Sequence, residues 1–208
     1  MVIHLILVLF LKYIIKYFFR KYDYHNIFRS IFCLLISLSS LSISLLNWNN
    51  LLMYPLSSNI QSTFINNLMF SYMVYDFIYF FIRKKIRIEL CLHHLLCAYL
   101  FYYYNLLILT FCSTCEIISA FNWISIIYPK YVWMTKYIRL TTILSVRFFI
   151  WFATSLILTN ISNNYYVNSY HIQIPLLYIY LILSFFIMLD CYWLFIILQN
   201  FIKFNKNK

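Results

Sequence analysis

Six ionisable side chains interrupt stretches of sequence that are otherwise apolar. They are Asp76, His93, His94, Glu116, Arg147 and Asp190. A charge inside a membrane is costly and usually serves a function. We therefore interpret this set as the functional centre, with Asp76, Glu116 and the two histidines as its catalytic candidates. The alternative is a polar network that only fixes how the helices pack.

The two adjacent histidines have the chemistry for proton transfer. Neighbouring residues on an α-helix point about 100° apart, so only one of His93 and His94 can face a given cavity. We expect one imidazole to act as a base and the other to make a supporting hydrogen bond. A metal site built from two helical histidines prefers a spacing of three or four residues. We therefore assign no metal ligand, and keep a metal site only as a weaker alternative.

Arg147 needs a counter-charge from another part of the chain. No acidic residue lies near it in its own apolar stretch, so we expect its partner to be Glu116 or Asp190. At a rise of about 1.5 Å per residue, the ionisable groups lie deep enough in their stretches to reach a common space. The sequence therefore predicts that they converge on one chamber open to the cytosol.

The elements that carry these groups belong to a membrane protein. Of the 208 residues, 64% are hydrophobic and 10% are charged, which is more apolar than a soluble domain can bury. The net charge of +11 would suggest nucleic acid in a soluble chain, but here the charges flank apolar stretches, so we expect no nucleic-acid partner. All six cysteines fall inside apolar stretches, which favours free, buried thiols over disulfides.

Seven stretches approach the length of about 20 apolar residues that a transmembrane helix needs. They are 2–19, 27–46, 64–82, 88–104, 106–128, 138–159 and 174–202. In the second of them, small residues recur at helical spacing at Ser37, Ser40 and Ser44. This predicts a face for close packing against other helices.

The basic residues indicate how these stretches are oriented. All Lys and Arg residues except Arg147 lie in four clusters, at 12–29, 83–87, 130–139 and 203–208. Basic and neutral ends alternate along the seven stretches. By the positive-inside rule, we expect a lumenal or external N-terminus and a cytosolic C-terminus.

Five motifs follow one another across the six C-terminal stretches. They are Tyr72-Met73-Val74-Tyr75-Asp76; the pair His93-His94; Glu116 followed by Ser119, Phe121 and Asn122; Arg147; and Asp190 with Trp193. In this order they resemble the TLC-domain family, which includes the ceramide synthases and the translocating-chain-associated membrane proteins. The chain lacks the two closely spaced Asp residues of the ceramide synthases, and Ala120 stands where the family usually has Pro. It is therefore more similar to the small TLC-domain proteins.

The resemblance implies an all-α fold with seven transmembrane helices, six of which form a barrel around a lipid-sized cavity. It divides the chain into an anchor helix and basic loop at 1–26, a six-helix domain at 27–202 and a basic tail at 203–208. It also implies the endoplasmic reticulum, membrane lipids as partners, no bound cofactor and acyl-CoA as a candidate substrate. The residues expected to line the cavity or form its ion pair are Arg147, Asp190, Trp193, Ser119, Asn122 and Tyr72.

Three functions stay open at this stage. An acyltransferase would move an acyl group from acyl-CoA to a lipid amine or hydroxyl, with His93 or His94 as the base. A non-catalytic lipid-binding or lipid-sensing protein would use the same cavity. A heptahelical receptor or transporter also matches the orientation, but the chain has no Asp/Glu-Arg-Tyr or Asn-Pro-x-x-Tyr signature and no internal repeat. The sequence does not determine the oligomeric state.

Overall fold

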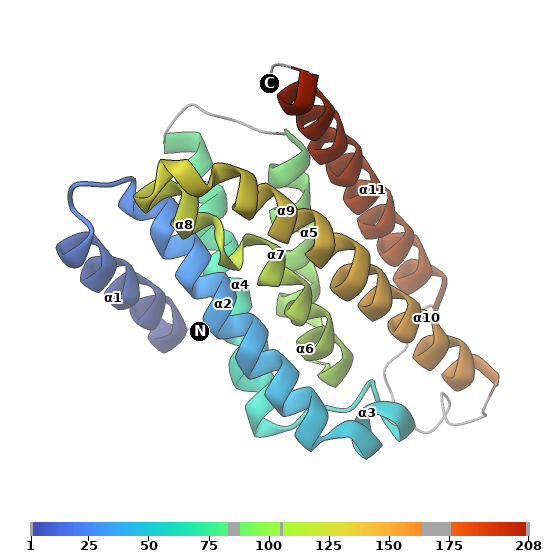
Figure 1. Cartoon of the computed structure of the whole chain (residues 1–208). Coiled ribbons are helices and arrows are strands. Elements are labelled where there is room, and N and C mark those ends of the chain that lie inside the picture. The colour runs from blue at the N-terminus through green and yellow to red at the C-terminus, as the bar shows by residue number, and fades with distance from the viewer. Residues whose placement is uncertain (1, 83–87, 105, 164–175, 207–208) are drawn as a thin grey trace.

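The computed structural model describes residues 2–82, 88–104, 106–163 and 176–206. Every regular element in these ranges is a helix, and no strand occurs among them (Figure 1). The α-helices are α1 (Val2–Phe18), α2 (Tyr24–Leu46), α3 (Trp48–Met53), α4 (Ile60–Ile82), α5 (Ile88–Tyr103), α6 (Leu107–Ser113), α7 (Ile117–Ala120), α8 (Asn122–Ile127), α9 (Val132–Thr142), α10 (Phe148–Asn163) and α11 (Leu176–Lys206). Two 3₁₀ segments, η1 (Thr114–Glu116) and η2 (Pro129–Tyr131), and one π segment, η3 (Ile143–Arg147), join them. The expected all-α class is confirmed.

Helical segments occupy most of each of the seven expected stretches. Side-chain caps explain where two of the helices begin. The carboxylate of Asp23 accepts a hydrogen bond from the backbone N–H of Asn26 (3.4 Å), so α2 begins at Tyr24, ahead of the expected residue 27. The side chain of Asn59 accepts one from the backbone N–H of Ser62 (2.7 Å), so α4 begins at Ile60. Residues 174 and 175 of the last expected stretch lie outside the described residues.

Four helical stretches are long and apolar enough to cross a membrane: Tyr24–Leu46, Leu107–Ile127, Pro129–Thr159 and Leu181–Gln199. A fifth, Ile88–Tyr103, is apolar but shorter. The first helix, α1, has 17 residues, and α4 buries polar side chains such as Asn66 and Asp76 along its length. The structure thus has the helices of an integral membrane protein, with four of the seven expected spans meeting the length and hydropathy of a membrane crossing.

The fifth expected stretch is not one regular helix. It is divided into α6, η1, α7 and α8, although the sequence predicts a single helix over 106–128. The hydroxyl of Ser113 donates to the carbonyl oxygen of Leu109 (3.0 Å), a bond that bends helices, and a 3₁₀ turn follows at once. This irregular turn leaves the carbonyl oxygen of Cys115 able to accept a hydrogen bond from the side chain of Arg147 (2.9 Å).

The sixth expected stretch contains a π segment that ends at Arg147. The hydroxyls of Thr142 and Ser145 each donate to the carbonyl four residues earlier, to Ile138 and Thr141 (2.6 Å each). Such bonds loosen the regular helical ladder, and π segments are common at functional sites. Arg147 is the last residue of this segment and is buried.

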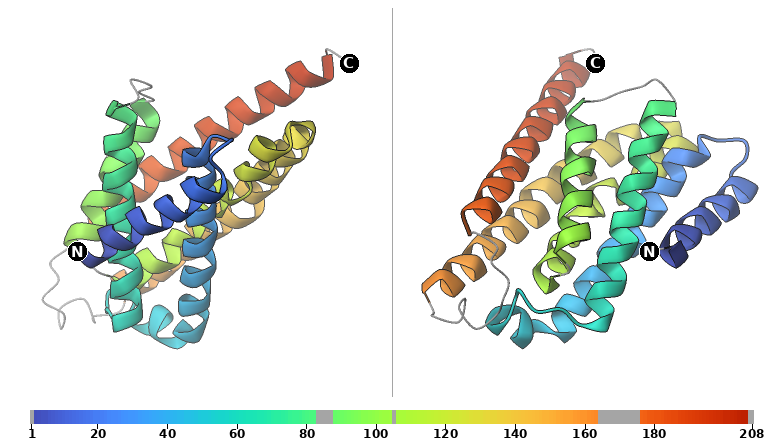
Figure 2. Two further views of the ribbon diagram at one scale, coloured as in Figure 1. Left: turned by 90° about the vertical axis from the view of Figure 1, so that its left-hand side faces the viewer. Right: turned by 180° about the vertical axis from the view of Figure 1, so that it is seen from behind.

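The helices form a bundle in which α1 lies on the outside, against α2 and α4 (Figures 1 and 2). The helix ends next to the four basic clusters lie towards one end of this bundle: the α1–α2 connection, the end of α4, the start of α9 and the end of α11 (Figure 1). The small α3 and the start of α6 lie towards the opposite end. The alternation of basic and neutral ends in the sequence is therefore also an alternation in space.

The serine face of α2 is an internal packing surface. Ser37, Ser40 and Ser44 are all buried, where α2 packs against α4, α6 and α7. Small side chains allow helix backbones to approach closely in lipid. This prediction from helical spacing is confirmed.

Large apolar side chains cover much of the outer surface. On α10, Phe149 is 61% exposed and Phe152 is 64% exposed, whereas Ile150 and Trp151 on the opposite side are buried. A soluble monomer rarely exposes a contiguous apolar surface of this kind. The outward side of the helix is suited to contact with acyl chains of a bilayer.

Candidate functional site

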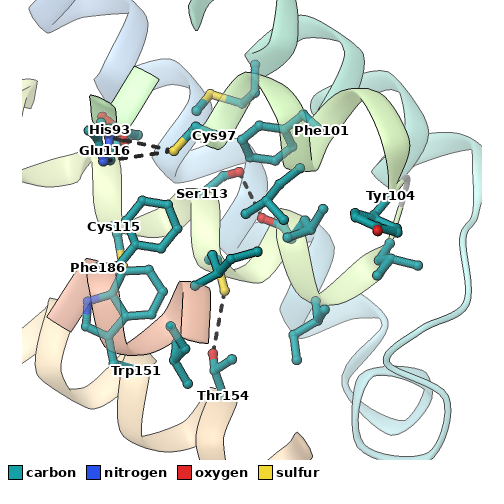
Figure 3. A pocket seen from close by; sticks show the side chains of 18 of the residues that line it. His93, Cys97, Phe101, Tyr104, Ser113, Cys115, Glu116, Trp151, Thr154 and Phe186 are labelled. Carbon is teal, nitrogen blue, oxygen red and sulfur yellow. Dashed lines mark hydrogen bonds and ion pairs between the residues drawn. The ribbon is translucent and has the colours of Figure 1, made fainter. Parts of the chain in front are cut away.

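An apolar cavity of about 420 Å³ lies between α5, α6, α10 and α11. Its walls are largely aliphatic and aromatic, and four of its polar side chains, those of His93, Glu116, Arg147 and Asp190, lie at one end. The rise of a helix places about 12 Å between His93 and Phe101 along α5, and the same distance between Asp190 and Ile182 along α11. The cavity is therefore elongated, with a polar end near His93 and an apolar end near Phe101. Figure 3 shows His93 and Glu116 at one end and Tyr104 at the other.

At the polar end, His93 of α5 faces Glu116 of η1. Its Nε2 lies 3.5 Å from Glu116 Oε1. Both residues line the cavity, and His93 is buried. A carboxylate beside an imidazole fixes the orientation of the ring. This pair has the arrangement of a general base with its orienting acid.

Arg147 and Asp190 form a second pair at the same end. The guanidinium of Arg147 donates through Nη1 to Asp190 Oδ1 and through Nε to the carbonyl oxygen of Cys115 (2.9 Å). The other oxygen of Asp190 accepts a hydrogen bond from Trp151 Nε1 (2.7 Å). Arg147, Asp190 and Trp151 are all buried. Of the two partners expected for Arg147, Asp190 is the one that forms the ion pair with it.

Trp193 packs against His93 and Arg147 at this end of the cavity. Its ring meets His93 edge-on at 5.6 Å between centroids, and the guanidinium carbon of Arg147 lies 5.3 Å from its ring centre. Among the described residues, its buried Nε1 has no hydrogen-bond partner. Trp193 thus contacts a member of each polar pair, although it is not among the residues that line the cavity.

The second histidine points away from the cavity, towards Asp76. His94 Nδ1 lies 3.5 Å from Asp76 Oδ2, and Arg29 Nε lies 3.0 Å from the same oxygen. His25 Nε2 lies 3.1 Å from Asp76 Oδ1. Asp76 has no exposed surface, and three cationic or polar partners from two other helices compensate its charge. We call Asp76, His25, Arg29 and His94 the Asp76 cluster.

Aromatic rings and α1 cover the Asp76 cluster. The ring of His25 stacks on Tyr79 at 3.3 Å between centroids, and its Nδ1 lies 3.2 Å from the hydroxyl of Tyr75. The ammonium group of Lys12, on α1, lies 4.8 Å from the ring centre of Tyr75. The N-terminal helix thus shields a buried ionic cluster from the surrounding lipid.

Tyr72 and Cys33 connect the cluster to the cavity. The thiol of Cys33 lies 3.8 Å from the hydroxyl of Tyr72 and 3.7 Å from Glu116 Oε2. Tyr72 is buried and its ring stacks on Phe32 at 4.2 Å between centroids. It is not among the residues that line the cavity, and it lies between His94 of the Asp76 cluster and Cys33, which contacts Glu116.

The six ionisable side chains do not converge on one chamber, contrary to the prediction from the sequence. His93, Glu116, Arg147 and Asp190 line the cavity, whereas Asp76 and His94 do not. The physical reason is the angle of about 100° between adjacent helical residues, which sends the two histidines to different neighbours. The helix that carries Asp76, α4, packs against α5 on the side from which His94 projects.

Two other residues named by the resemblance do not line the cavity. Ser119 lies in α7 and Asn122 begins α8, beyond the irregular turn that holds Glu116. A regular helix would have placed Ser119 on the face of Glu116. The 3₁₀ turn and the break at Phe121 change the direction of the side chains that follow, which explains why neither residue lines the cavity.

Sequence reasoning missed His25, Arg29, Trp151 and Cys97. Arg29 belongs to the basic cluster at 12–29 and His25 to none, yet the two are four apart and so share one face of α2. A buried Asp76 with no cation on its own helix needs such partners, and this need was a usable signal. Nothing in the sequence singled out Trp151 as the donor to Asp190.

The thiols are free, as expected, but they are not all buried. Cys33, Cys91, Cys97 and Cys115 are buried, Cys112 is half-buried and Cys191 is exposed on the outer surface. In the part of the chain that the structure describes, no group of three or more His, Cys, Asp or Glu residues could hold a metal ion.

No protein-family model, no curated protein and no solved structure matches this chain.

Proposed function

We propose that this chain is a polytopic membrane protein that holds the acyl part of a lipid in the cavity between α5, α6, α10 and α11. In this proposal it crosses the membrane seven times, with the six C-terminal spans arranged as a TLC-type barrel. The observation that carries it is the combination of an elongated apolar cavity with polar groups at one end. A lipid has the same division between an apolar chain and a polar head.

The dimensions and lining of the cavity support an acyl chain as its occupant. Its volume of about 420 Å³ lies within the usual range of small-molecule sites, about 300–1,000 Å³. The walls offer aliphatic side chains such as Leu158 and Leu183, with aromatic rings at Phe101 and Phe186. An acyl chain in these surroundings loses no hydrogen bonds, whereas its carbonyl would meet the polar groups near His93.

The chemistry that we propose at the polar end is acyl transfer. His93 removes the proton from the hydroxyl or amine of an acceptor lipid, and Glu116 holds the imidazole in position. The oxygen or nitrogen of the acceptor attacks the thioester carbonyl of an acyl-CoA, and CoA leaves with the proton. His94 is a positioning residue in this scheme, because it contacts Asp76 and not the cavity.

A second candidate is a lipid-binding protein without turnover. The ion pair of Arg147 with Asp190, the hydrogen bond of Trp151 and the Asp76 cluster are all buried and mutually compensated. Such networks also occur where they only specify the packing of helices. The same cavity would then store or sense a lipid.

The orientation in the membrane follows from the basic helix ends. We place the end of the bundle that holds the α1–α2 connection and the end of α11 in the cytosol, in the membrane of the endoplasmic reticulum (Figure 1). The polar groups near His93 are then on the cytosolic side of the apolar part of the cavity. Acyl-CoA, which is made in the cytosol, would approach from this side. Protease protection of a tag placed at the C-terminus in sealed microsomes tests this orientation.

Lipid occupancy is tested with two variants of the same helix. Leu183→Trp fills the cavity, because Leu183 is 7% exposed and lines it, whereas Leu181→Trp adds the same ring to a residue that is 57% exposed. Lipids that co-purify with each variant in mild detergent are extracted and quantified by mass spectrometry. We expect Leu183→Trp to lose most of the bound lipid and Leu181→Trp to retain it. Equal lipid in both variants, with both folded, contradicts the proposed site.

Turnover separates the two candidate functions. Membranes containing the wild-type chain, His93→Gln or His94→Gln are supplied with palmitoyl-CoA and acceptor lipids, and the products are followed by mass spectrometry. Acyl transfer predicts a loss of product of about 100-fold or more in His93→Gln, the contribution of a general base, with bound lipid unchanged. Bound lipid with no conversion by the wild type would favour the second candidate.

A further inference from the structure

A cysteine thiol adjoins the His93–Glu116 pair inside the cavity. Cys97 lies one helical turn after His93 on α5, and its Sγ is 3.9 Å from His93 Nδ1 and 3.8 Å from Nε2. Nε2 of the same ring faces Glu116 Oε1 at 3.5 Å. If Nε2–H donates to the carboxylate, the lone pair of Nδ1 is the acceptor for the proton of the thiol. Thiol, imidazole and carboxylate thus follow one another in the order of a nucleophile, its base and the group that orients the base.

The thiol is also placed where an acyl group would be held. Cys97 lines the cavity, about 6 Å further along α5 than His93 in the direction of the apolar end. Figure 3 shows Cys97 between the His93–Glu116 pair and Phe101. A chain attached to its sulfur would run along Leu100 and Phe101, away from the polar groups.

Other thiols of the chain lack one part of this arrangement. Cys112 lines the same cavity, but its Sγ contacts the hydroxyl of Thr154 (3.6 Å), which is not a base at neutral pH. Cys33 contacts Glu116 but does not line the cavity. Among the thiols of the described residues, the combination of cavity, imidazole and carboxylate belongs to Cys97.

We propose that Cys97 is a nucleophile that receives the acyl group of a long-chain acyl thioester and carries it as a covalent S-acyl intermediate. This inference rests on the proposed lipid cavity and adds a covalent step to it. His93 takes the proton from the Cys97 thiol, and the sulfur bonds to the thioester carbonyl carbon of acyl-CoA. The carbon–sulfur bond to CoA then breaks, and the CoA sulfur takes the proton from His93. The products are S-acyl Cys97 and free CoA, and no electron is gained or lost overall.

The second half of the reaction uses the same residues. An acceptor hydroxyl or amine gives its proton to His93 and attacks the S-acyl carbonyl, and the sulfur of Cys97 leaves and regains a proton. A thioester is exchanged for a thioester in the first step, so the intermediate keeps the reactivity of the donor. Dividing one transfer into two steps in this way is the usual advantage of covalent catalysis. Without an acceptor lipid, the second step cannot follow and the acyl-enzyme accumulates.

The test uses the full chain, purified in detergent without added acceptor and incubated with palmitoyl-CoA. Intact-protein mass spectrometry detects the adduct, peptide mapping locates it, and neutral hydroxylamine, which cleaves thioesters, must remove it. The variants are Cys97→Ser, Cys112→Ser as a matched control from the same cavity, and His93→Gln. Bound, non-covalent lipid is measured in each sample.

We expect one palmitoyl group on Cys97 of the wild type and of Cys112→Ser, none at this position in Cys97→Ser, and formation about 100-fold slower in His93→Gln. Acylation of Cys112 or Cys191 to the same extent as Cys97 would show unspecific transfer and overturn the inference. Bound lipid without any adduct would overturn the covalent step but leave the lipid cavity intact. Absence of both would overturn the proposed function as well. Because the site is mapped in the wild type, the result stands even if Cys97→Ser fails to fold.

Discussion

Replacing Asp190 by leucine should destabilise the protein more than any substitution on its outer surface. The substitution leaves the guanidinium of Arg147 buried without its counter-charge, and Trp151 Nε1 without its acceptor. Breaking a buried ion pair by removing one partner costs about 3–5 kcal/mol. We expect this loss in the free energy of unfolding for Asp190→Leu, and a similar loss for Arg147→Met.

The double variant should cost less than the two single variants together. If both substitutions acted independently, they would cost about 6–10 kcal/mol. With both charges removed, Trp151 Nε1 loses its acceptor and the carbonyl oxygen of Cys115 loses its guanidinium donor, each at a cost of about 1–3 kcal/mol. The double variant should therefore lose about 2–6 kcal/mol, and Trp151→Phe in that background should recover part of it.

The free energies can be measured by reversible unfolding in mixed micelles of a mild detergent and sodium dodecyl sulfate. Met188→Leu is a control on the same helix as Asp190, because Met188 is exposed on the outer surface and its replacement should change stability by less than about 0.5 kcal/mol. A loss below about 1 kcal/mol for Asp190→Leu, or strict additivity in the double variant, would refute the reasoning. Either result would mean that water hydrates the Arg147–Asp190 pair, or that another side chain replaces the missing partner.

Three further outcomes follow from buried positions. Asp76→Asn removes the charge that Arg29 and the two histidines of the Asp76 cluster compensate, so we expect a loss of about 3–5 kcal/mol in the same micelle assay; no loss would mean that the cluster is not formed. Ser40→Leu overfills the buried serine face of α2 and should cost about 1–3 kcal/mol, whereas Ser40→Ala should be nearly neutral, and equal effects of the two would contradict the close packing there. Leu158→Trp fills the apolar end of the cavity, so lipids extracted from this variant should carry shorter acyl chains than those from the wild type; an unchanged chain-length profile in mass spectrometry would place the acyl chain elsewhere.

Much of the fold was predictable because it depends on local features of the chain. The absence of Gly and the long apolar stretches left helix as the available structure, since a backbone in lipid must satisfy its own hydrogen bonds. The helical spacing of Ser37, Ser40 and Ser44 predicted the packing face of α2. The isolated charge of Arg147 predicted a partner from another helix. The helix breaks at Glu116 and at the π segment were not predictable, because they arise from hydroxyls and tertiary contacts that compete with the regular ladder.

The sequence by itself determined which residues are polar in an apolar setting, and hence that Asp76, His93, Glu116, Arg147 and Asp190 need partners. A charge that leaves water needs compensation wherever it lies, so its presence in an apolar stretch carries this information. Only the tertiary structure decided which partner each one takes, because that choice depends on the rotation of each helix about its axis. Helix geometry fixes an angle of about 100° between the ring that faces the cavity and the ring that faces Asp76, and the packing of all the helices together sets the rotation of α5 that gives each ring its neighbour.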